Sequence, residues 1–528
     1  MFLVRVIFLS FATLTFVLAG NPYWVFFEDD STRIEVQLTA RADARLSLKG
    51  SPQPIRDFSV SPNHLATLRS AGFKIRHASR LLNAVSLELE DDVGLNYLIQ
   101  LPFVTQLKPV ARSVFTAPRQ DQINTQLARI SNLPYGQSLA QNEMLNIPAI
   151  HDLGYDGSGV LIGVFDTGFL TDHPVFDELD IWGRHDFVDH EVDPNGVGHS
   201  HGISVLSVLG GYSPGELIGP AYGASFLLAR TENVIGESRI EEDNWVAALE
   251  WADSLGVDII SSSLNYRDFD GTAEDYPDSA IDGETTIISR AANIAAERGI
   301  LVVNSASNDG PSTGSIWPPA DSRHVLSVGA VTAEGEIAYF SSRGPTYDGR
   351  IKPDVVAMGV SVYMASSIDG YQRSNGTSFS TPLVAGLSAL LLQAHPELKP
   401  DSVIALFHQN GDQAASPDNV YGHGLPDLSH LFQKLQDIES TNIPVYPNPS
   451  SEQIVKLVLP GPMADKIKNG DLFDIRGRKI ASLLIEPVSP QIVQVTLPLN
   501  SNLANQLTII TLYSDDQVYS GKLVYLKP

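Results

Sequence analysis

Short apolar runs alternate with helical patterns through the middle of this chain, and this alternation constrains the fold more than any other feature. The apolar runs are Gly159–Phe165, Val257–Ile260 and Ile300–Val303. The helical patterns begin near His201 and cover Asn244–Leu255 and Ile287–Arg298. Buried strands that alternate with helices are typical of a parallel sheet with helices on both faces. The sequence therefore predicts an α/β domain over residues 142–436, with reactive groups at the carboxyl ends of its strands.

Length and composition narrow the class of protein further. The chain has 528 residues, more than one compact core holds, so we expect about two to four domains. Hydrophobic residues make up 43% and charged residues 18%, which indicates globular domains. The net charge of −26 would repel a phosphate backbone and excludes nucleic acid as an expected partner, although it also fits a solvated acidic surface. The absence of cysteine excludes disulfides, thiolate metal sites and a cysteine nucleophile.

The first residues have the pattern of a secretory signal peptide. Arg5 supplies positive charge, Val6–Ala19 is mostly apolar, and Val17–Ala19 offers small residues at cleavage spacing. The apolar run is short for a spanning helix, and an uncleaved anchor is the less favoured alternative. No later segment combines transmembrane length with absence of charge, so we expect a signal peptide over residues 1–19 and a mature protein without a transmembrane segment.

Two smaller units are expected to flank the α/β domain. Residues 20–112 alternate strand and helix patterns in the order of a small βαββαβ unit, and residues 113–141 form a Gln/Asn/Ser-rich linker suited to cleavage. Residues 445–528 contain short strands separated by turn signals, which predicts a small β-sandwich. The predicted strands of this last unit are Ile454–Leu459, Asp471–Asp474, Ile492–Leu497, Leu507–Tyr513 and Val518–Leu526.

The segment Asn375–Pro382 places Ser378 between a glycine-containing turn and a helix that is predicted to open with Pro382. A serine hydroxyl is a weak nucleophile until a base takes its proton, and a helix N-terminus favours developing negative charge. The same segment also fits an ordinary capped helix start. A catalytic interpretation therefore needs a base, an orienting acid and donors for an oxyanion.

Three residues supply these groups. Asp166 follows an apolar strand and could orient an imidazole, and His201 near a helix start is suited to act as a general base. Asn308 follows another strand and could donate to an oxyanion. Each residue also has a structural interpretation: a turn aspartate, a surface histidine and a loop asparagine. His199 and His201 could instead bind a metal, but a third ligand is not evident.

The order Asp, His, Asn, Ser resembles that of the subtilisin-like serine proteases, the subtilases. The matching motifs are Phe165–Gly168, His201–Gly202, Asn308 and Gly376–Pro382, supported by Gly256–Ile260, Phe340–Pro345 and Lys352–Val355. The resemblance implies that Ser378 is the nucleophile, His201 its base and Asp166 the residue that orients the imidazole. It also implies that Asn308 and the Ser378 N–H bind the oxyanion, and it favours His201 over His199.

This chain departs from the family pattern at three places. Ile203 replaces a threonine after the His-Gly pair, and Ser307 replaces the glycine before Asn308, which we interpret as a mild change. The substrate-binding segment, usually Ser-Leu-Gly, is Ser263–Leu264–Asn265. This segment is implied to pair with a substrate backbone, and Asn265 is expected to narrow the primary specificity pocket.

The flanking units also have family resemblances. Residues 20–112 resemble the inhibitory, folding-assisting propeptide of the family, with a permanent accessory domain as the alternative. The tail resembles the C-terminal sorting domain of the Bacteroidetes-type (type nine) secretion system, with a generic β-sandwich as the alternative. The motifs in the tail are Val445–Pro449, Leu472–Arg478 and Lys522–Lys527.

An acidic insertion lies between Asp268 and Glu284. Oxygen-rich loops bind calcium, and many subtilisins use calcium for stability, but the spacing matches no known cage. A solvated acidic loop is the favoured interpretation, so no metal-ligating residues are assigned and no cofactor is expected for catalysis. The acidic residues are Asp268, Asp270, Glu274, Asp275, Asp278, Asp282 and Glu284.

The sequence thus predicts a secreted or cell-surface serine endopeptidase, exported through the periplasm, that cleaves polypeptides through an acyl-enzyme on Ser378. Its expected partners are polypeptide substrates, its own propeptide and the type nine secretion machinery. The alternatives are a catalytically silent binding protein on the same fold, an acid-active Ser-Glu-Asp peptidase, and a transpeptidase or cyclase that uses the same residues.

Overall fold

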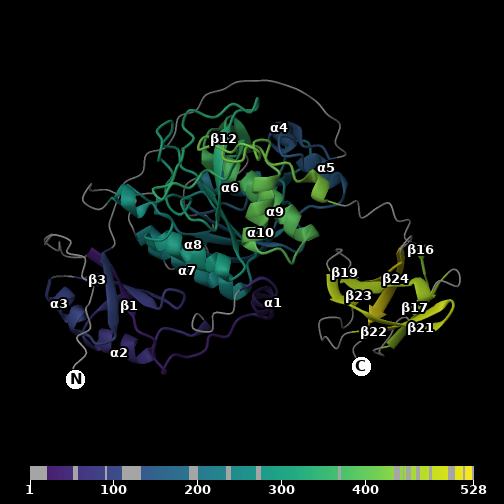
Figure 1. The fold of residues 1–528 in the computed structure, drawn as a ribbon, viewed down its shortest axis with the longest axis horizontal. Coiled ribbons are helices and arrows are strands. Elements are labelled where there is room, and N and C mark those ends of the chain that lie inside the picture. The colour runs from purple at the N-terminus through teal and green to yellow at the C-terminus, as the bar shows by residue number, and fades with distance from the viewer. Residues whose placement is uncertain are drawn as a thin grey trace.

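The computed structural model describes three groups of elements along the chain (Figure 1). The expected signal peptide and residues 113–132 of the predicted linker lie outside the described residues. The described ranges are 21–50, 57–89, 92–109, 133–189, 200–233, 240–268, 275–366, 370–432, 441–443, 445–446, 454–459, 464–474, 479–497, 506–514 and 518–525.

A seven-stranded sheet forms the centre of the molecule, with the strand order β13-β12-β11-β10-β5-β9-β6. Every pair of neighbouring strands in it is parallel, so the predicted α/β fold is confirmed. The apolar runs form its central strands because a strand buried on both faces needs apolar side chains on both. The strands are β5 (Leu161–Asp166), β6 (Asp180–Asp186), β9 (Ser225–Arg230), β10 (Ile259–Ser262), β11 (Leu301–Ser305), β12 (Val325–Val331) and β13 (Val355–Met358).

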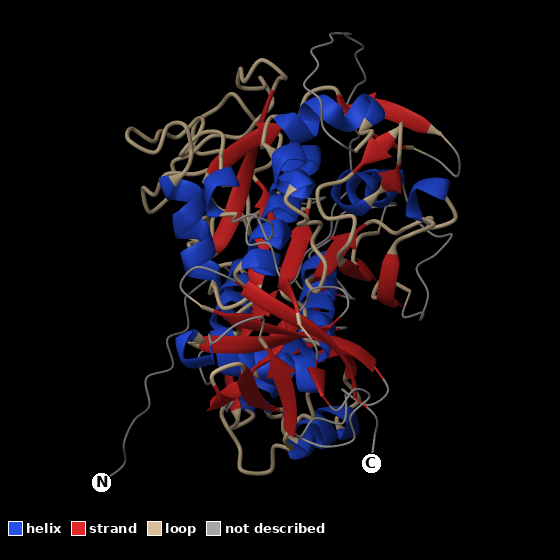
Figure 2. Cartoon of the chain, turned by 90° about the vertical axis from the view of Figure 1, so that its right-hand side faces the viewer, coloured by secondary structure: helices blue, strands red, loops and turns tan. Residues whose placement is uncertain are grey.

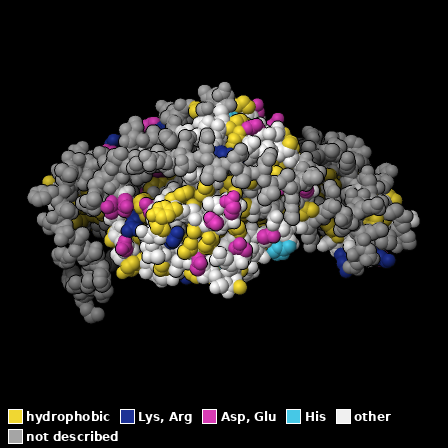
Figure 3. Space-filling model, turned by 90° about the horizontal axis from the view of Figure 1, so that it is seen from above, with side chains coloured by type: hydrophobic (Ala, Val, Ile, Leu, Met, Phe, Trp, Pro, Cys, Tyr) yellow, Lys and Arg dark blue, Asp and Glu magenta, His cyan; other side chains and the backbone are white. Residues whose placement is uncertain are grey.

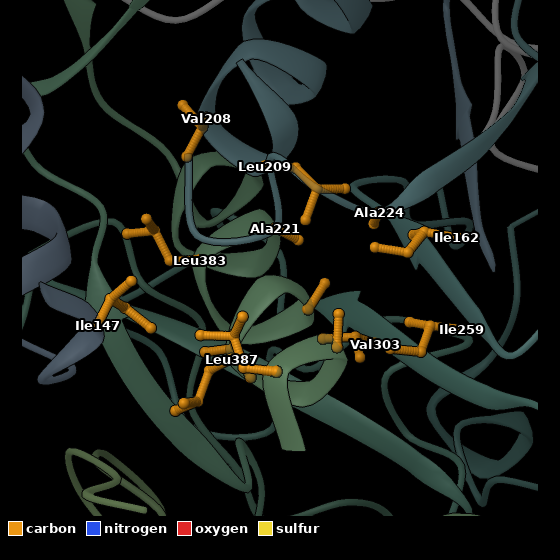
Figure 4. Packing of buried hydrophobic residues seen from close by; sticks show 14 of the residues in the cluster. Ile147, Ile162, Val208, Leu209, Ala221, Ala224, Ile259, Val303, Leu383 and Leu387 are labelled. Atoms are coloured by element: carbon orange, nitrogen blue, oxygen red, sulfur yellow. The ribbon is translucent and has the colours of Figure 1, made fainter. Parts of the chain in front are cut away.

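Helices cover both faces of this sheet (Figure 2). Alternate residues of β5 point to opposite sides: Ile162 and Val164 join the core under α5, α6, α9 and α10, whereas Leu161 and Phe165 join the core under α7 and α8. Figure 4 shows the first of these cores, where side chains of α6 and α9 meet those of the strands. The helices are α4 (Leu139–Glu143), α5 (Ile147–Asp152), α6 (Ser200–Gly210), α7 (Ile240–Leu255), α8 (Ile287–Glu297), α9 (Thr377–Ala394) and α10 (Pro400–Gln409).

Helix α9 runs through the first core, and every residue from Thr377 to Leu392 is buried. Among the described helices it is the one with the length and apolar composition of a membrane span, and 89% of it is buried inside the fold, as in a core helix. Its first residue is Thr377, so Pro382 lies inside the helix, and the prediction that the helix opens with Pro382 was wrong. Two small hairpins complete this region: β7 (Tyr212–Ser213) with β8 (Leu217–Ile218), and β14 (Val362–Ala365) with β15 (Tyr371–Ser374).

The N-terminal unit is an antiparallel four-stranded sheet in the order β2-β3-β1-β4. The helix α1 was not predicted, because its charged side chains conceal the apolar period. The elements of the N-terminal unit are β1 (Asn21–Phe27), α1 (Ala40–Lys49), α2 (Pro62–Ser70), β2 (Lys74–Ser79), β3 (Ala84–Leu89), α3 (Asp92–Gln100) and β4 (Val104–Pro109). Trp24 and Phe26 of this sheet belong to the same buried cluster as α7 and α8, so the N-terminal unit completes that core.

Buried ion pairs join the N-terminal unit to α7. Asp253 is fully buried and pairs with Arg45 and Arg80 of the N-terminal unit and with Arg298, whose Nε lies 2.9 Å from its carboxylate. Three cationic partners hold the pKa of Asp253 below its ordinary value although burial would raise it. Asp258, just beyond α7, pairs in the same way with cations of α1.

The C-terminal region forms two sheets around a core of its own, as a sandwich does. One sheet has the order β16-β24-β23-β19-β20 and the other β17-β18-β22-β21. The strands are β16 (Thr441–Asn442), β17 (Val445–Tyr446), β18 (Ile454–Val458), β19 (Asn469–Asp474), β20 (Lys479–Ser482), β21 (Leu484–Ser489), β22 (Ile492–Thr496), β23 (Gln506–Tyr513) and β24 (Val518–Tyr525).

The substitution Arg45→Ala should loosen the N-terminal unit. It removes one partner of a buried carboxylate, so the opening free energy of β1–β4 should fall by about 3 kcal/mol. Hydrogen exchange of the amides in these strands measures that energy. Lys74→Ala is the matched control, because Lys74 and Glu88 form an exposed pair whose loss should cost less than about 1 kcal/mol. Equal effects of the two substitutions would contradict the importance of the buried pair.

Candidate active site

Asp166 and His201 are brought together by the end of β5 and the start of α6. The Nδ1 atom of His201 lies 2.8 Å from Oδ1 of Asp166, and the Asp166 side chain is fully buried. The N–H of Thr167 donates to the same carboxylate oxygen at 2.7 Å. Gly202 is required beside His201, because a Cβ there would lie 2.1 Å from the carbonyl oxygen of Gly168. The His-Gly pair therefore permits the close approach of α6 to β5.

The environment of His201 raises its pKa above the ordinary value. Burial alone would lower this pKa, but the charge of Asp166, the hydrogen bond between the two side chains and the charge of Glu232 outweigh it. Glu232 lies just past the carboxyl end of β9, the neighbour of β5 in the sheet. Its effect was missed from the sequence, where a strand-ending glutamate has no distinguishing signal.

Ser378 is the second residue of α9, where the helix dipole favours negative charge. Pro382 lacks the N–H that would normally bond the carbonyl of Ser378 four residues earlier. That carbonyl instead accepts a hydrogen bond of 2.9 Å from Oγ of Ser263. The Oγ of Ser378 lies 3.5 Å from the carbonyl oxygen of Ser263. Pro382 thus frees a carbonyl that ties the predicted nucleophile to the predicted substrate-binding segment.

Asn308 is fixed by the residue that precedes Ser378. Its Oδ1 accepts hydrogen bonds from the backbone N–H and the Oγ1 of Thr377, at 2.9 and 3.0 Å. These two bonds leave the Nδ2 end of the amide as its donor, on an exposed residue beside the start of α9. Thr377 was not singled out from the sequence, although it lies within the Gly376–Pro382 motif.

The predicted substrate-binding residues follow β10. Ser263 contacts Ser378, the carbonyl of Leu264 accepts from Nδ2 of Asn304 at 2.9 Å, and Asn265 contacts Ser305, the last residue of β11. The structure therefore brings Asp166 to His201, Ser263 to Ser378 and Asn308 to Thr377, all at the carboxyl edge of the sheet. His199, the alternative to His201, lies outside the described residues.

Two departures from the family pattern have different structural consequences. Ile203 is 2% exposed and belongs to the core under α6, so an apolar side chain suits its place. Ser307 has a φ of 91°, a conformation that favours glycine and costs other residues about 1–3 kcal/mol. The prediction that Ser307 is a mild change therefore understates its effect on the backbone.

Two of the described acidic residues of the insertion have partners within the protein. Asp278 pairs with Arg267, and both oxygens of Asp282 accept hydrogen bonds from the following turn. In the described part of the chain, groups of three or more His, Asp or Glu arranged to hold a metal are absent. Residues 269–274 lie outside that part. On the face shown in Figure 3, acidic side chains are interspersed with apolar and uncharged ones.

The protein has an α/β fold with a parallel sheet. The carboxyl edge of this sheet carries an aspartate–histidine pair and a serine in the first turn of a helix, an arrangement of the serine-hydrolase type. The chain belongs to the subtilase family, peptidase S8, whose model matches residues 157–424. A second model, the peptidase S8 propeptide domain of Bacteroidota, matches residues 22–128. The N-terminal unit is therefore a propeptide domain.

Individual relatives agree with this family. Serine protease AprX of Bacillus subtilis is 34% identical over 300 residues, which span 51% of this chain and 65% of AprX, slightly less than two thirds of its length. Subtilisin E of Bacillus subtilis is 30% identical over 331 residues, 62% of this chain and 74% of that protein. Subtilisin of Bacillus pumilus is 31% identical over 271 residues, 50% of this chain and 86% of that protein.

The substitution Asp166→Asn should lower the pKa of His201, because it removes the charge that favours the imidazolium. The protonated pair contributes stability below about pH 6.5, and this contribution is lost as the pH rises through the raised pKa of His201. In the variant this pH dependence should disappear. NMR titration of the His201 ring, assigned with a His201→Gln variant, measures the pKa. Glu232→Gln should lower it less, and an unchanged pKa in Asp166→Asn would contradict the pairing.

Proposed function

We propose that this protein is a secreted serine endopeptidase that hydrolyses peptide bonds through an acyl-enzyme on Ser378. The observation that supports this most is the 2.8 Å contact between Asp166 and His201 at the sheet edge where α9 presents Ser378. Membership of the subtilase family adds a second, independent support. A fold that only bound polypeptides would not need a buried carboxylate to orient an imidazole at that edge.

In the proposed reaction, Oγ of Ser378 attacks the carbonyl carbon of the substrate while Nε2 of His201 takes its proton. Asp166 holds the proton on Nδ1 and stabilises the imidazolium that forms. The carbonyl oxygen becomes an oxyanion, which accepts hydrogen bonds from Nδ2 of Asn308 and the N–H of Ser378. His201 then protonates the leaving amine, and the C–N bond breaks.

The second half of the cycle repeats these roles with water. His201 takes a proton from a water molecule, whose oxygen attacks the acyl carbon, and the tetrahedral oxyanion forms again. Its collapse releases the product as a carboxylic acid, which loses its proton to the solvent, and Oγ of Ser378 regains its proton from His201. All groups belong to the chain, so the proposal needs no organic cofactor, and a stabilising calcium ion stays a prediction. The Ser263–Asn265 segment would pair with the substrate backbone by strand addition.

We also propose that the chain is made as an exported zymogen with five segments. Residues 1–19 would be the signal peptide, 20–112 the propeptide, 113–141 the processing region, 142–436 the peptidase domain and 445–528 the sorting domain. The ion pairs on Asp253 would keep the propeptide docked until cleavage in the linker. Export through the periplasm and the type nine machinery would place the enzyme at the cell surface or outside the cell.

Labelling with a fluorophosphonate tests the nucleophile directly. The purified, propeptide-free protein should be labelled, whereas Ser378→Ala and His201→Ala should not. Ser380→Ala is the matched control, because Ser380 is a buried serine of the same helix that bonds only the carbonyl of Thr377 at 2.9 Å, and this variant should label normally. Absence of labelling in the wild type would overturn the proposal in favour of a silent binding protein, and ligated or cyclic products would indicate a transpeptidase or cyclase.

Asn308→Ala should lower kcat by about 100- to 1,000-fold, because one oxyanion donor is lost. KM should change little, since the bond forms mainly in the transition state. Steady-state kinetics on a peptide substrate measure both constants. A rise in KM at constant kcat would instead assign Asn308 to ground-state binding.

A further inference from the structure

Two chain segments leave neighbouring strands and contact the start of α9. β10 and β11 are parallel, and Ser262 is paired with Asn304 at their carboxyl ends. The segment after β10 reaches Ser378 through Ser263, and the segment after β11 reaches Thr377 through Asn308. The proposed nucleophile and oxyanion donor are therefore each fixed to one of these two segments.

The side chain of Asn265 bridges the segment after β10 and Ser305, the last residue of β11. Its Nδ2 donates to the carbonyl oxygen of Ser305 at 2.8 Å, and its Oδ1 accepts from Oγ of Ser305 at 2.8 Å. Nδ2 also lies 3.4 Å from the carbonyl oxygen of Trp317. Both ends of the amide are thus held by Ser305, and the bridge is part of the fold.

A loop that contains Pro318 is hydrogen-bonded to the residue after Asn265. The N–H of Tyr266 donates to the carbonyl oxygen of Pro318 at 2.9 Å, which fixes the loop against the Asn265 segment. A fully buried apolar cluster joins this loop to the segment that carries Asn308, and it consists of Ala306, Ile316 and Ala320. Displacing Asn265 would leave the polar atoms of Ser305 without these partners, at a cost in free energy.

The proposed reaction would bring a substrate side chain to this bridge. A substrate whose carbonyl carbon meets Oγ of Ser378 has its carbonyl oxygen directed at Asn308. In that pose the residue that supplies the carbonyl would direct its side chain between the segment that begins at Ser263 and the end of β11 at Ser305. Asn265 spans this gap with hydrogen bonds to Ser305, so the depth available to that side chain ends at the bridge.

We propose that Asn265 is the specificity-determining residue of this site and limits the residue on the acyl side of the cleaved bond to Gly, Ala or Ser. The inference rests on the proposed endopeptidase function and names its substrate class. A larger side chain would have to break both hydrogen bonds between Asn265 and Ser305. Replacement of Asn265 by glycine removes the bridge and opens the gap to large apolar side chains.

The test uses tetrapeptide p-nitroanilides that differ only in the residue before the anilide, with Ala, Leu and Phe in turn. For the wild type, kcat/KM should be at least about 10-fold higher for Ala than for Phe. Asn265→Gly should raise kcat/KM for Phe about 10- to 100-fold and change the value for Ala less than about threefold. Asn410→Gly is the matched control, because Asn410 bonds a helix carbonyl at the end of α10, and its substitution should leave the Ala-to-Phe ratio unchanged.

Fluorophosphonate titration of each preparation separates this inference from the proposed function. A wild type that labels and prefers Phe overturns the role of Asn265 and leaves the endopeptidase standing, whereas a wild type that does not label overturns the endopeptidase itself. A second measurement does not depend on the folding of Asn265→Gly. Mass spectrometry of casein digested by the wild type should find Gly, Ala or Ser before most cleaved bonds, and predominant cleavage after Phe or Leu would contradict the inference.

Discussion

Burial of both faces of the parallel sheet is the constraint on which the rest of this structure depends. Helices cover one face through α6 and α9 and the other through α7 and α8, so the strands are mainly apolar and the candidate site residues lie at or just after the strand ends. Because parallel strands have their carboxyl ends at the same edge, Asp166, Ser263 and Asn308 emerge together although long stretches of chain separate them. The site is therefore a consequence of how the core is buried.

One residue shows how closely the site is coupled to the core. Pro382 lies within a helix that is buried from Thr377 to Leu392, where a proline would normally cost about 3 kcal/mol. The carbonyl that it leaves unbonded belongs to Ser378 and is satisfied by Ser263. The contact that compensates for the proline therefore fixes the start of α9 against the end of β10.

Much of the fold and the site could be predicted from the sequence because local patterns encode them. The buried strands and the residues Asp166, His201 and Ser378 stand out through apolar runs and short motifs. The helix α1 could not be predicted, since its arginines gain their acidic partners Asp253 and Asp258 from α7 and the segment just after it, far along the chain. The strain at Ser307 and the bridge formed by Asn265 were equally inaccessible, because a backbone angle and a contact across two segments are set by tertiary structure.

The ion pairs on α7 have a consequence for the protein after its propeptide has left. Asp253 and Asp258 lose Arg80 and the arginines and lysine that α1 supplies, whereas Arg298 keeps its place beside Asp253. Carboxylates that were neutralised by neighbours then depend on mobile ions from the solvent. At physiological ionic strength such charges are screened over about 8 Å. Dissolved salt therefore takes over part of the charge compensation that the propeptide provided, on a polypeptide whose net charge is already strongly negative.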